Sequence, residues 1–190
     1  MGEETTTRTI DNRLVPATGN WMIDPTHTTI AAVARHLMVT KVRGHFASFS
    51  GSITVAENPE DSTVEITMDA ASITTGTEDR DNHLRSADFL NVEEYPTLVF
   101  RSTSVEANGD KWKLTGDLTI RDITNPIVLD LEFLGVANDP WGNSKAAFEA
   151  SAELERKAWG LTWNVPLAQG GVLVSDKFKI EIQAQAAPQQ

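Results

Sequence analysis

The chain reads Arg80-Asp81-Asn82-His83-Leu84-Arg85-Ser86-Ala87-Asp88-Phe89-Leu90-Asn91, then Glu94-Tyr95-Pro96-Thr97 and Phe100-Arg101-Ser102-Thr103. This stretch is the most informative part of the chain, because a charged helical pattern interrupts an otherwise continuous series of strand patterns. We expect a short helical segment near residues 76–91. Thr75 and Glu78 have the spacing of a capping box, and Pro96 predicts the end of the segment. A helix in this position is typical of a lid over the mouth of a barrel.

Helical spacing divides this segment into two faces. One face carries Arg80, His83, Leu84 and Ala87, and the other carries Asp81, Arg85 and Asp88. The second face predicts an exposed strip of ion pairs, each worth at most ~1 kcal/mol. On the first face, Arg80 and His83 either hydrogen-bond the helix to the barrel rim or contact a ligand.

Strand patterns fill the chain on both sides of the helix. Residues alternate with a period of two at 64–69, 112–120 and 127–133, and further strands are expected near 28–35, 42–55, 98–105, 145–154 and 172–184. The pair Asn108-Gly109 is the strongest hairpin signal. About eight sequential antiparallel strands, each apolar on one face, predict an all-β fold: a single up-and-down β-barrel, because closure leaves no exposed edge.

The termini and the charge limit the class of protein. We expect one domain over residues 20–184 between flexible tails at 1–19 and 185–190, which are polar and have little to bury. The first residues lack the apolar stretch of a secretory signal and no stretch is long and apolar enough to span a bilayer, which predicts a cytoplasmic protein without an integral membrane segment.

The chemistry available to the chain is restricted too. A formal net charge of −11 and 16 scattered Lys and Arg residues argue against nucleic-acid binding and against adsorption to an anionic bilayer, so a lipid ligand must be taken inside. No cysteine is present, and we expect no cofactor. His27, His36 and His45 recur every nine residues, but an odd spacing reverses the face of a strand, and no metal site is expected.

Small residues recur among large ones on the apolar faces. The examples are Ala32 and Ala34 beside Ile30, Gly51 beside Phe49 and Ile53, Ala70 beside Met68, Gly116 between Leu114 and Leu118, and Ala150 and Ala152 between Phe148 and Leu154. If they point inward, they leave an apolar tunnel that favours burial of a hydrocarbon by roughly 25 cal/mol per Å². The alternative is a packed interior, with the small residues at bends or filled by bulky neighbours.

The charged segment, together with Ile23-Asp24-Pro25-Thr26-His27 and Gly116-Asp117-Leu118-Thr119-Ile120-Arg121, resembles the YceI-like family of polyisoprenoid-binding proteins over roughly residues 21–182. Two positions depart from the family pattern: Asp122 replaces a glycine, and Leu90 stands where a second phenylalanine is common. The resemblance implies a lipocalin-like barrel that holds a long isoprenoid tail, sometimes quinone-bearing or diphosphate-bearing, in its lumen.

Carried over by position, the resemblance implies an apolar ligand-binding set: Ile30, Val33, Phe46, Phe49, Met68, Ile73, Leu84, Phe89, Phe100, Leu118, Leu131 and Phe148. The candidates for a polar head group are Arg80, His83, His27 and His36. Strand parity limits these assignments. On a regular strand Phe46 and Phe49 cannot both face inward, and neither can Ile30 and Val33.

Three functional hypotheses follow. The leading one is a non-enzymatic protein that binds and sequesters or carries an amphiphilic isoprenoid lipid of the polyprenyl or isoprenoid-quinone type. The second is an enzyme acting on a hydrophobic substrate in the same cavity, with His83 or His36 as general acid or base. The third is an interaction module with a packed barrel.

Two features of the sequence each fit two different roles. The segment Trp159-Gly160-Leu161-Thr162-Trp163 either corks the barrel end or closes the pocket at the rim, where indoles can touch a membrane. Family members often pair, so the resemblance also implies a homodimer as one arrangement. Leu37 fits either a dimer face or the core.

Overall fold

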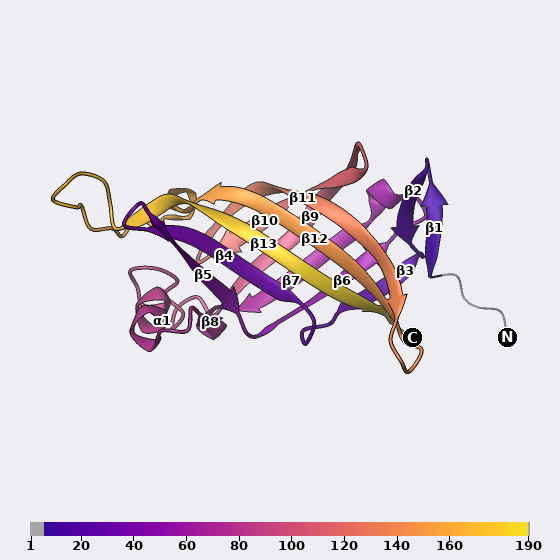
Figure 1. The fold of residues 1–190 in the computed structure, drawn as a ribbon, viewed down its shortest axis with the longest axis horizontal. Helices are drawn as coiled ribbons and strands as arrows, with labels where there is room; N and C mark the ends of the chain where they lie inside the picture. Colours follow the sequence, from indigo (N-terminus) through magenta and orange to yellow (C-terminus); the bar gives the residue numbers. More distant parts are fainter. Residues whose placement is uncertain (1–5, 190) are drawn as a thin grey trace.

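The computed structural model describes residues 6–189 and shows a closed barrel of antiparallel strands with one α-helix, α1, at one end (Figure 1). The helix spans Glu78–Arg85. The strands are β1 (Thr7–Ile10), β2 (Arg13–Pro16), β3 (Gly19–Ile23), β4 (Thr29–His36), β5 (Thr40–Phe46), β6 (Phe49–Val55), β7 (Thr63–Asp69), β8 (Ile73–Thr74), β9 (Thr97–Asn108), β10 (Lys111–Ile120), β11 (Ile123–Asn138), β12 (Ser144–Glu155) and β13 (Val174–Pro188). Short 3₁₀ turns lie at Pro59–Asp61, Ala70–Ser72 and Arg156–Trp159.

The barrel has eight long strands, as predicted. Three of these long strands are interrupted, and each consists of two segments: β3 and β4, β5 and β6, and β7 and β8. The strand β13 closes the ring by pairing with β12 on one side and with β3 and β4 on the other. Every pairing between these strands is antiparallel. Apart from the pairing that closes the ring, each long strand pairs with its neighbours in sequence, and the closed ring leaves no long edge exposed.

A partly buried carboxylate, that of Asp24, holds the interruption between β3 and β4. The backbone N–H of Asp24 donates to the Gln185 carbonyl at 2.8 Å, which keeps the broken strand attached to β13. The Asp24 side chain accepts hydrogen bonds from Lys145 Nζ at 2.8 Å and from Thr26 Oγ1 at 2.6 Å. The hydrogen bonds from Lys145, then Thr26, hold the pKa of Asp24 far below its usual value.

The first strands correct the prediction of a flexible tail over 1–19. The segments β1 and β2 form a hairpin at the barrel end opposite α1 (Figure 1). Arg13 Nε donates to the Gly109 carbonyl at 2.8 Å, Arg8 Nη1 donates to the Glu57 carbonyl at 2.6 Å, and Val15 is buried in the main core. The hairpin therefore covers this end of the lumen. Residues 1–5 of the predicted tail lie outside the described residues.

The second predicted tail is also largely ordered. Residues 185–188 belong to β13, and Pro188 pairs with Trp21 of β3. Residue 190 lies outside the described part of the chain. Along 6–189 no helix combines the length and the apolar composition that a membrane-spanning helix requires.

The helix α1 is shorter than the predicted segment, and its cap differs. Its N-cap is Thr77, which makes no side-chain capping bond, so the expected capping box from Thr75 to Glu78 is absent. The expected strip of exposed ion pairs is also wrong. Asp81 is buried, and Arg85 donates from Nε to the Ala71 carbonyl at 2.7 Å and from Nη2 to the Ile73 carbonyl at 2.9 Å. These residues attach the helix to the barrel instead of facing water.

Candidate functional site

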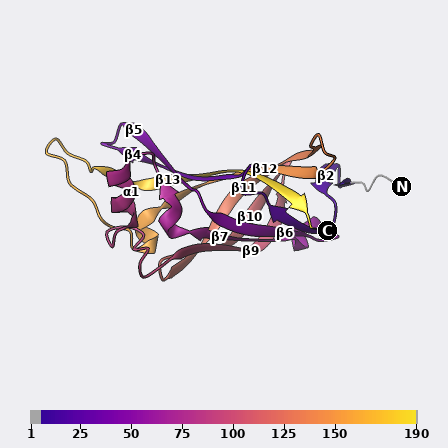
Figure 2. The same cartoon turned by 90° about the horizontal axis from the view of Figure 1, so that it is seen from below.

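A cavity of about 590 Å³ lies inside the barrel, lined mainly by aliphatic and aromatic side chains. Ile30, Met68, Phe100 and Leu118 are examples from four different strands. This volume is within the range of pockets that enclose a small-molecule ligand. The packed-interior alternative is therefore wrong for this barrel. Figure 2 shows the same barrel from below, with α1 beside the strand ends at one end of the barrel.

The cavity wall includes ten of the twelve apolar residues that the resemblance assigned to the ligand, together with the head-group candidates Arg80 and His83. The residues present are Ile30, Phe46, Met68, Ile73, Arg80, His83, Leu84, Phe89, Phe100, Leu118, Leu131 and Phe148. Val33 is not among them, because it lies opposite Lys179 and Arg43 on the outward face of β4. Phe49 lies opposite Met68 and packs against the core without lining the cavity.

The small residues divide into two groups. Ala32, Ala34 and Ala150 line the cavity, as the tunnel hypothesis predicted. Gly116 does not open the lumen, because a Cβ there would lie 2.4 Å from the ring of Phe100 and 2.6 Å from the Arg101 carbonyl. The ring of Phe100 occupies the space that the glycine leaves. Gly51 has the same role toward the carbonyl of Glu65, at 2.8 Å. Ala70 and Ala152 belong to the packed core.

One buried carboxylate ties the helix to the barrel. Asp81 is 5% exposed and accepts hydrogen bonds from Thr75 N at 2.7 Å, Thr75 Oγ1 at 2.6 Å and Thr74 Oγ1 at 3.0 Å. Burial opposes its ionisation, but the bonds from Thr75 and Thr74 and the charge of Arg85 together hold the pKa of Asp81 below its usual value. Sequence reasoning placed this residue on the exposed face, because local helical spacing carries no information about which face meets the barrel.

The side chain of His83 lies at the cavity wall and contacts two aromatic rings. Its ring is edge-on to Trp163, with ring centroids 4.4 Å apart, and to Phe89, with centroids 5.1 Å apart. The Nε2 atom lies 2.9 Å from Asp88 Oδ2. The ring is thus fixed by three neighbours, and one of its nitrogens is already engaged.

Arg80 lines the same opening of the cavity. Its guanidinium donates from Nε to Thr75 Oγ1 at 2.7 Å and from Nη2 to Thr77 Oγ1 at 3.1 Å. Over residues 6–189 it forms no ion pair with a carboxylate, so its positive charge is held by neutral acceptors. Such a cation can accept an anionic or carbonyl-bearing partner without displacing an existing carboxylate.

Sequence reasoning missed a buried arginine. Arg156 is 4% exposed, borders the cavity, and donates from Nη1 to the carbonyls of Leu161 at 2.7 Å and Trp163 at 2.9 Å. Its Nε donates to the Ser175 carbonyl at 3.0 Å. Burial lowers the pKa of Arg156, an effect that the nearby Asp176 opposes. An arginine at the end of a strand pattern resembles any surface charge, so the sequence offers no signal for this role.

The tryptophan cluster has both expected roles. Trp159 is buried and donates from Nε1 to the Leu118 carbonyl at 2.9 Å, which fits a cork at the barrel end. Trp163 lines the cavity beside His83. Among the other head-group candidates, His36 borders the cavity, whereas His27 pairs with Asp24 in the break between β3 and β4 and is absent from the wall. Within residues 6–189, no three His, Cys, Asp or Glu side chains cluster closely enough to hold a metal ion.

Known proteins resemble both the sequence and the fold. The YceI-like domain matches residues 21–186. A UPF0312 protein of Pseudomonas paraeruginosa is 43% identical over 136 residues, which cover 71% of each chain. The crystal structure of the Campylobacter jejuni YceI protein has a TM-score of 0.70 and 29% identity, covering 82% of this chain and 90% of that one. A polyisoprenoid-binding domain from Saccharophagus degradans has a TM-score of 0.66 at 13% identity, covering 89% and 98% of the two chains.

Proposed function

The chain belongs to the YceI-like family, and from this premise we propose that it binds an amphiphilic isoprenoid lipid in the barrel lumen. The apolar cavity of about 590 Å³ is the observation that carries the proposal. A hydrocarbon tail loses its contact with water there, and each Å² of buried apolar area contributes roughly 25 cal/mol. The solved domain from Saccharophagus degradans, which is described as polyisoprenoid-binding and shares this fold, supports the ligand class.

The polar end of the ligand would lie at the opening beside α1. Arg80, His83 and Thr75 border the cavity there, whereas the opposite end is covered by the apolar part of the β1–β2 hairpin. A guanidinium suits a phosphate, and a neutral donor is enough for a quinone carbonyl. We propose that the ligand has an isoprenoid tail and a head group that carries either a phosphate or a quinone carbonyl.

Mass spectrometry of organic extracts from the purified protein tests this function. We expect recovery of an isoprenoid quinone or polyprenyl phosphate and a rise in melting temperature when the same lipid is added. Repeated recovery of no lipid, together with no thermal shift, would refute the proposal. The Arg80→Gln variant separates the head groups, because it should weaken binding of a polyprenyl phosphate and leave binding of a quinone nearly unchanged.

The His83–Asp88 pair favours a second candidate, an enzyme acting on a hydrophobic substrate in the same cavity. The carboxylate at 2.9 Å orients the imidazole, and His83 borders the lumen where a substrate would lie. A turnover that is lost in His83→Ala while lipid binding survives would support this candidate. We propose binding as the primary function, since the cavity wall is otherwise dominated by apolar groups.

A further inference from the structure

The barrel end that carries α1 also bears an exposed apolar edge. The turn between β4 and β5 consists of Leu37, Met38 and Val39, which are 46%, 50% and 73% exposed. The loop before β13 adds Val165, which is 43% exposed. Both segments lie at this end of the barrel in Figures 1 and 2, and the loop before β13 extends beyond it. We call these four residues the mouth patch. A single exposed apolar side chain needs no explanation, but a group of them at one edge indicates an interaction surface.

Backbone contacts make the mouth patch one surface and place it beside the cavity. Leu37 N donates to the Leu173 carbonyl at 2.8 Å, and Leu173 N donates to the Val165 carbonyl at 2.9 Å. Met38 packs over Gly171, where a Cβ would lie 3.3 Å from Met38 Cγ. Leu173 itself lines the cavity. The patch therefore borders the lumen.

The backbone of the turn shows that folding alone does not require these apolar residues. Leu37 and Met38 have φ of 53° and 62°, and Val39 N donates to the His36 carbonyl at 3.1 Å, which defines a type I′ turn. Such turns favour Asn, Asp and Gly, and large side chains are strained there. The β1–β2 hairpin of the same chain places Asp11 and Asn12 at the matching positions, with φ of 49° and 62°. An apolar pair in this conformation points to a role for the side chains themselves.

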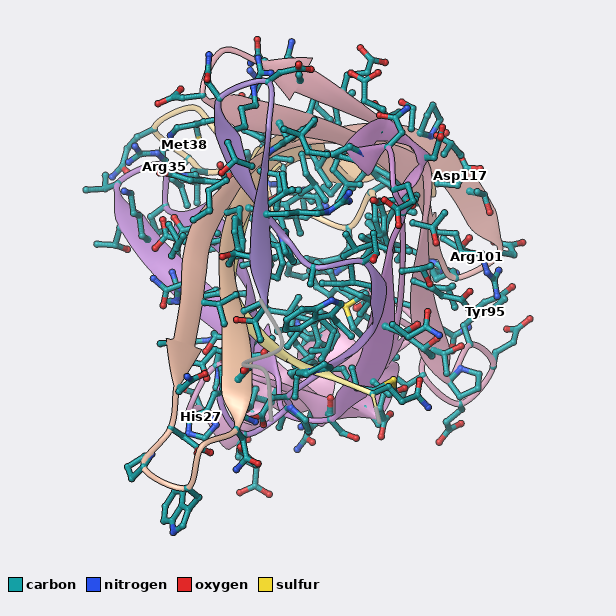
Figure 3. All side chains as sticks on the ribbon, turned by 90° about the vertical axis from the view of Figure 1, so that its right-hand side faces the viewer. His27, Arg35, Met38, Tyr95, Arg101 and Asp117 are labelled. Atoms are coloured by element: carbon teal, nitrogen blue, oxygen red, sulfur yellow. The ribbon has the colours of Figure 1, made fainter. Side chains whose placement is uncertain are left out.

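The charge around the mouth patch differs from that of the whole chain. Residues 35–43 contain Arg35, Lys41 and Arg43 and no acidic residue, and residues 163–173 contain no charged residue, although the net charge of the chain is −11. Arg43 pairs with Glu181, whereas Arg35 and Lys41 form no ion pair within residues 6–189. Arg35 Nη1 instead donates to the Val39 carbonyl at 3.4 Å. Figure 3, a view along the barrel, shows Arg35 and Met38 on the same side of the ring of strands.

We propose that the mouth patch docks on an anionic lipid bilayer. Leu37, Met38 and Val39 insert at the boundary between head groups and acyl chains, and Arg35 and Lys41 meet the lipid phosphates. The first turn of α1 carries Glu78 and Asp79, so the turn side of the opening, and not the helix side, faces the membrane. The basic residues form no cluster in the sequence, and they become a local feature only in the fold, where they flank the uncharged loop. The transfer step, in which lipid passes between bilayer and lumen without crossing water, rests on the proposed function.

A double substitution in the turn tests the docking without a folding defect. Leu37→Asn with Met38→Gly installs the residues that a type I′ turn favours, so the fold should be kept or stabilised. Trp141→Ser is the matched control, because Trp141 is 85% exposed in the β11–β12 turn, away from the mouth patch. Co-sedimentation with phosphatidylcholine vesicles, with and without phosphatidylglycerol, measures the partitioning. We expect the double variant to bind at least ~10-fold more weakly to the anionic vesicles, the control to bind like the unmodified chain, and Lys41→Gln to lose part of the preference for phosphatidylglycerol.

Several outcomes would overturn the docking proposal. One is that the unmodified chain does not bind anionic vesicles, and another is that Trp141→Ser removes binding while the double variant keeps it. A third is that the unmodified chain does not bind vesicles but forms a dimer in sedimentation velocity, and that the double variant is a monomer. The mouth patch would then be an interface between two copies of the chain. A protein partner captured by the unmodified chain counts against the proposal in the same way if vesicles are not bound.

A loading assay separates this proposal from the proposed function. A fluorescent isoprenoid is supplied either from vesicles or from a dilute ethanol stock. The docking proposal expects the double variant to load slowly from vesicles and to reach the same final occupancy from ethanol. Failure of every form of the chain to load, with vesicle binding intact, refutes the lumen function and leaves docking supported. Equal loading rates from vesicles for the double variant and the unmodified chain refute the transfer step.

Discussion

Asp81→Ala is predicted to release the helix from the barrel. The substitution leaves Thr75 N, Thr75 Oγ1 and Thr74 Oγ1 without their shared acceptor, and each of these bonds is to a charged carboxylate. Removing the acceptor from a buried donor costs about 1–3 kcal/mol, but the two hydroxyls can turn to water when the helix loosens. We therefore expect a loss of about 3 kcal/mol in the free energy of local opening of α1.

Amide hydrogen exchange measures this local opening directly. A loss of about 3 kcal/mol corresponds to roughly 100-fold faster exchange for the amides of residues 78–92, because 1.4 kcal/mol is a factor of ten. The matched control is Glu78→Ala, which removes an exposed carboxylate from the same helical turn. Unchanged exchange in Asp81→Ala, or an equal increase in Glu78→Ala, would refute the assignment of Asp81 as the anchor of the helix.

The pH dependence of the same exchange gives a second check. The folded-state pKa of Asp81 is lowered, so its stabilisation is fully present above the ordinary aspartate pKa of about 3.9 and is lost as the pH falls through the lower folded value. The protection of α1 should therefore stay constant from neutral pH to about pH 5 and decrease below about pH 4. In Asp81→Asn this acid-dependent part should be absent, and its persistence would contradict the account.

Three further predictions concern the barrel. Gly116→Ala should lower the free energy of unfolding by about 1–3 kcal/mol, because the new Cβ overlaps Phe100 and the Arg101 carbonyl. Urea titration measures this loss, and an unchanged urea midpoint would contradict the close contact. Arg156→Met should reduce the melting temperature and increase proteolysis within residues 160–173, because the carbonyls of Leu161 and Trp163 lose their donor; intact resistance would exclude this role. The unmodified chain should lose stability below about pH 4 as Asp24 is protonated, because the pKa of Asp24 is lowered in the folded state. Asp24→Asn should remove this part of the loss, and an unchanged acid-unfolding curve in circular dichroism would count against the Lys145 contact.

Much of the fold could be predicted from the sequence because the strands are half buried. The alternation in 112–120 and 127–133 reports which face meets the core, and Asn108-Gly109 marks a turn by its own backbone preference. The N-terminal hairpin was missed for the opposite reason. Its strands are only four residues long, and Val15 becomes a core residue only when the hairpin folds over the barrel end.

The apolar wall of the site was predictable, as were the polar candidates Arg80, His83 and His36 at its border, whereas the roles of the buried Asp81 and Arg156 were not. The family resemblance implied Ile30, Phe100 and Val33 alike, and strand parity showed only that Ile30 and Val33 cannot both face inward. The structure places Ile30 and Phe100 on the cavity wall and Val33 on the outward face of β4. Asp81 gains its role from the hydroxyls of Thr74 and Thr75 and from the Thr75 N–H, and Arg156 gains its role from backbone carbonyls that include that of Ser175. No local pattern encodes those partners, because tertiary contacts decide which charged side chain is buried.

The most direct test of the central claim uses two neighbouring residues on opposite faces of β4. Ala32 lines the cavity, and Val33 faces outward between Arg43 and Lys179. Titration of an isoprenoid quinone and a polyprenyl phosphate should show binding to the unmodified chain and to Val33→Phe, and at least ~10-fold weaker binding to Ala32→Phe, because the added ring fills apolar space that the tail needs. Equal affinity of the two variants, or no binding of either lipid to the unmodified chain, would contradict a ligand-binding lumen.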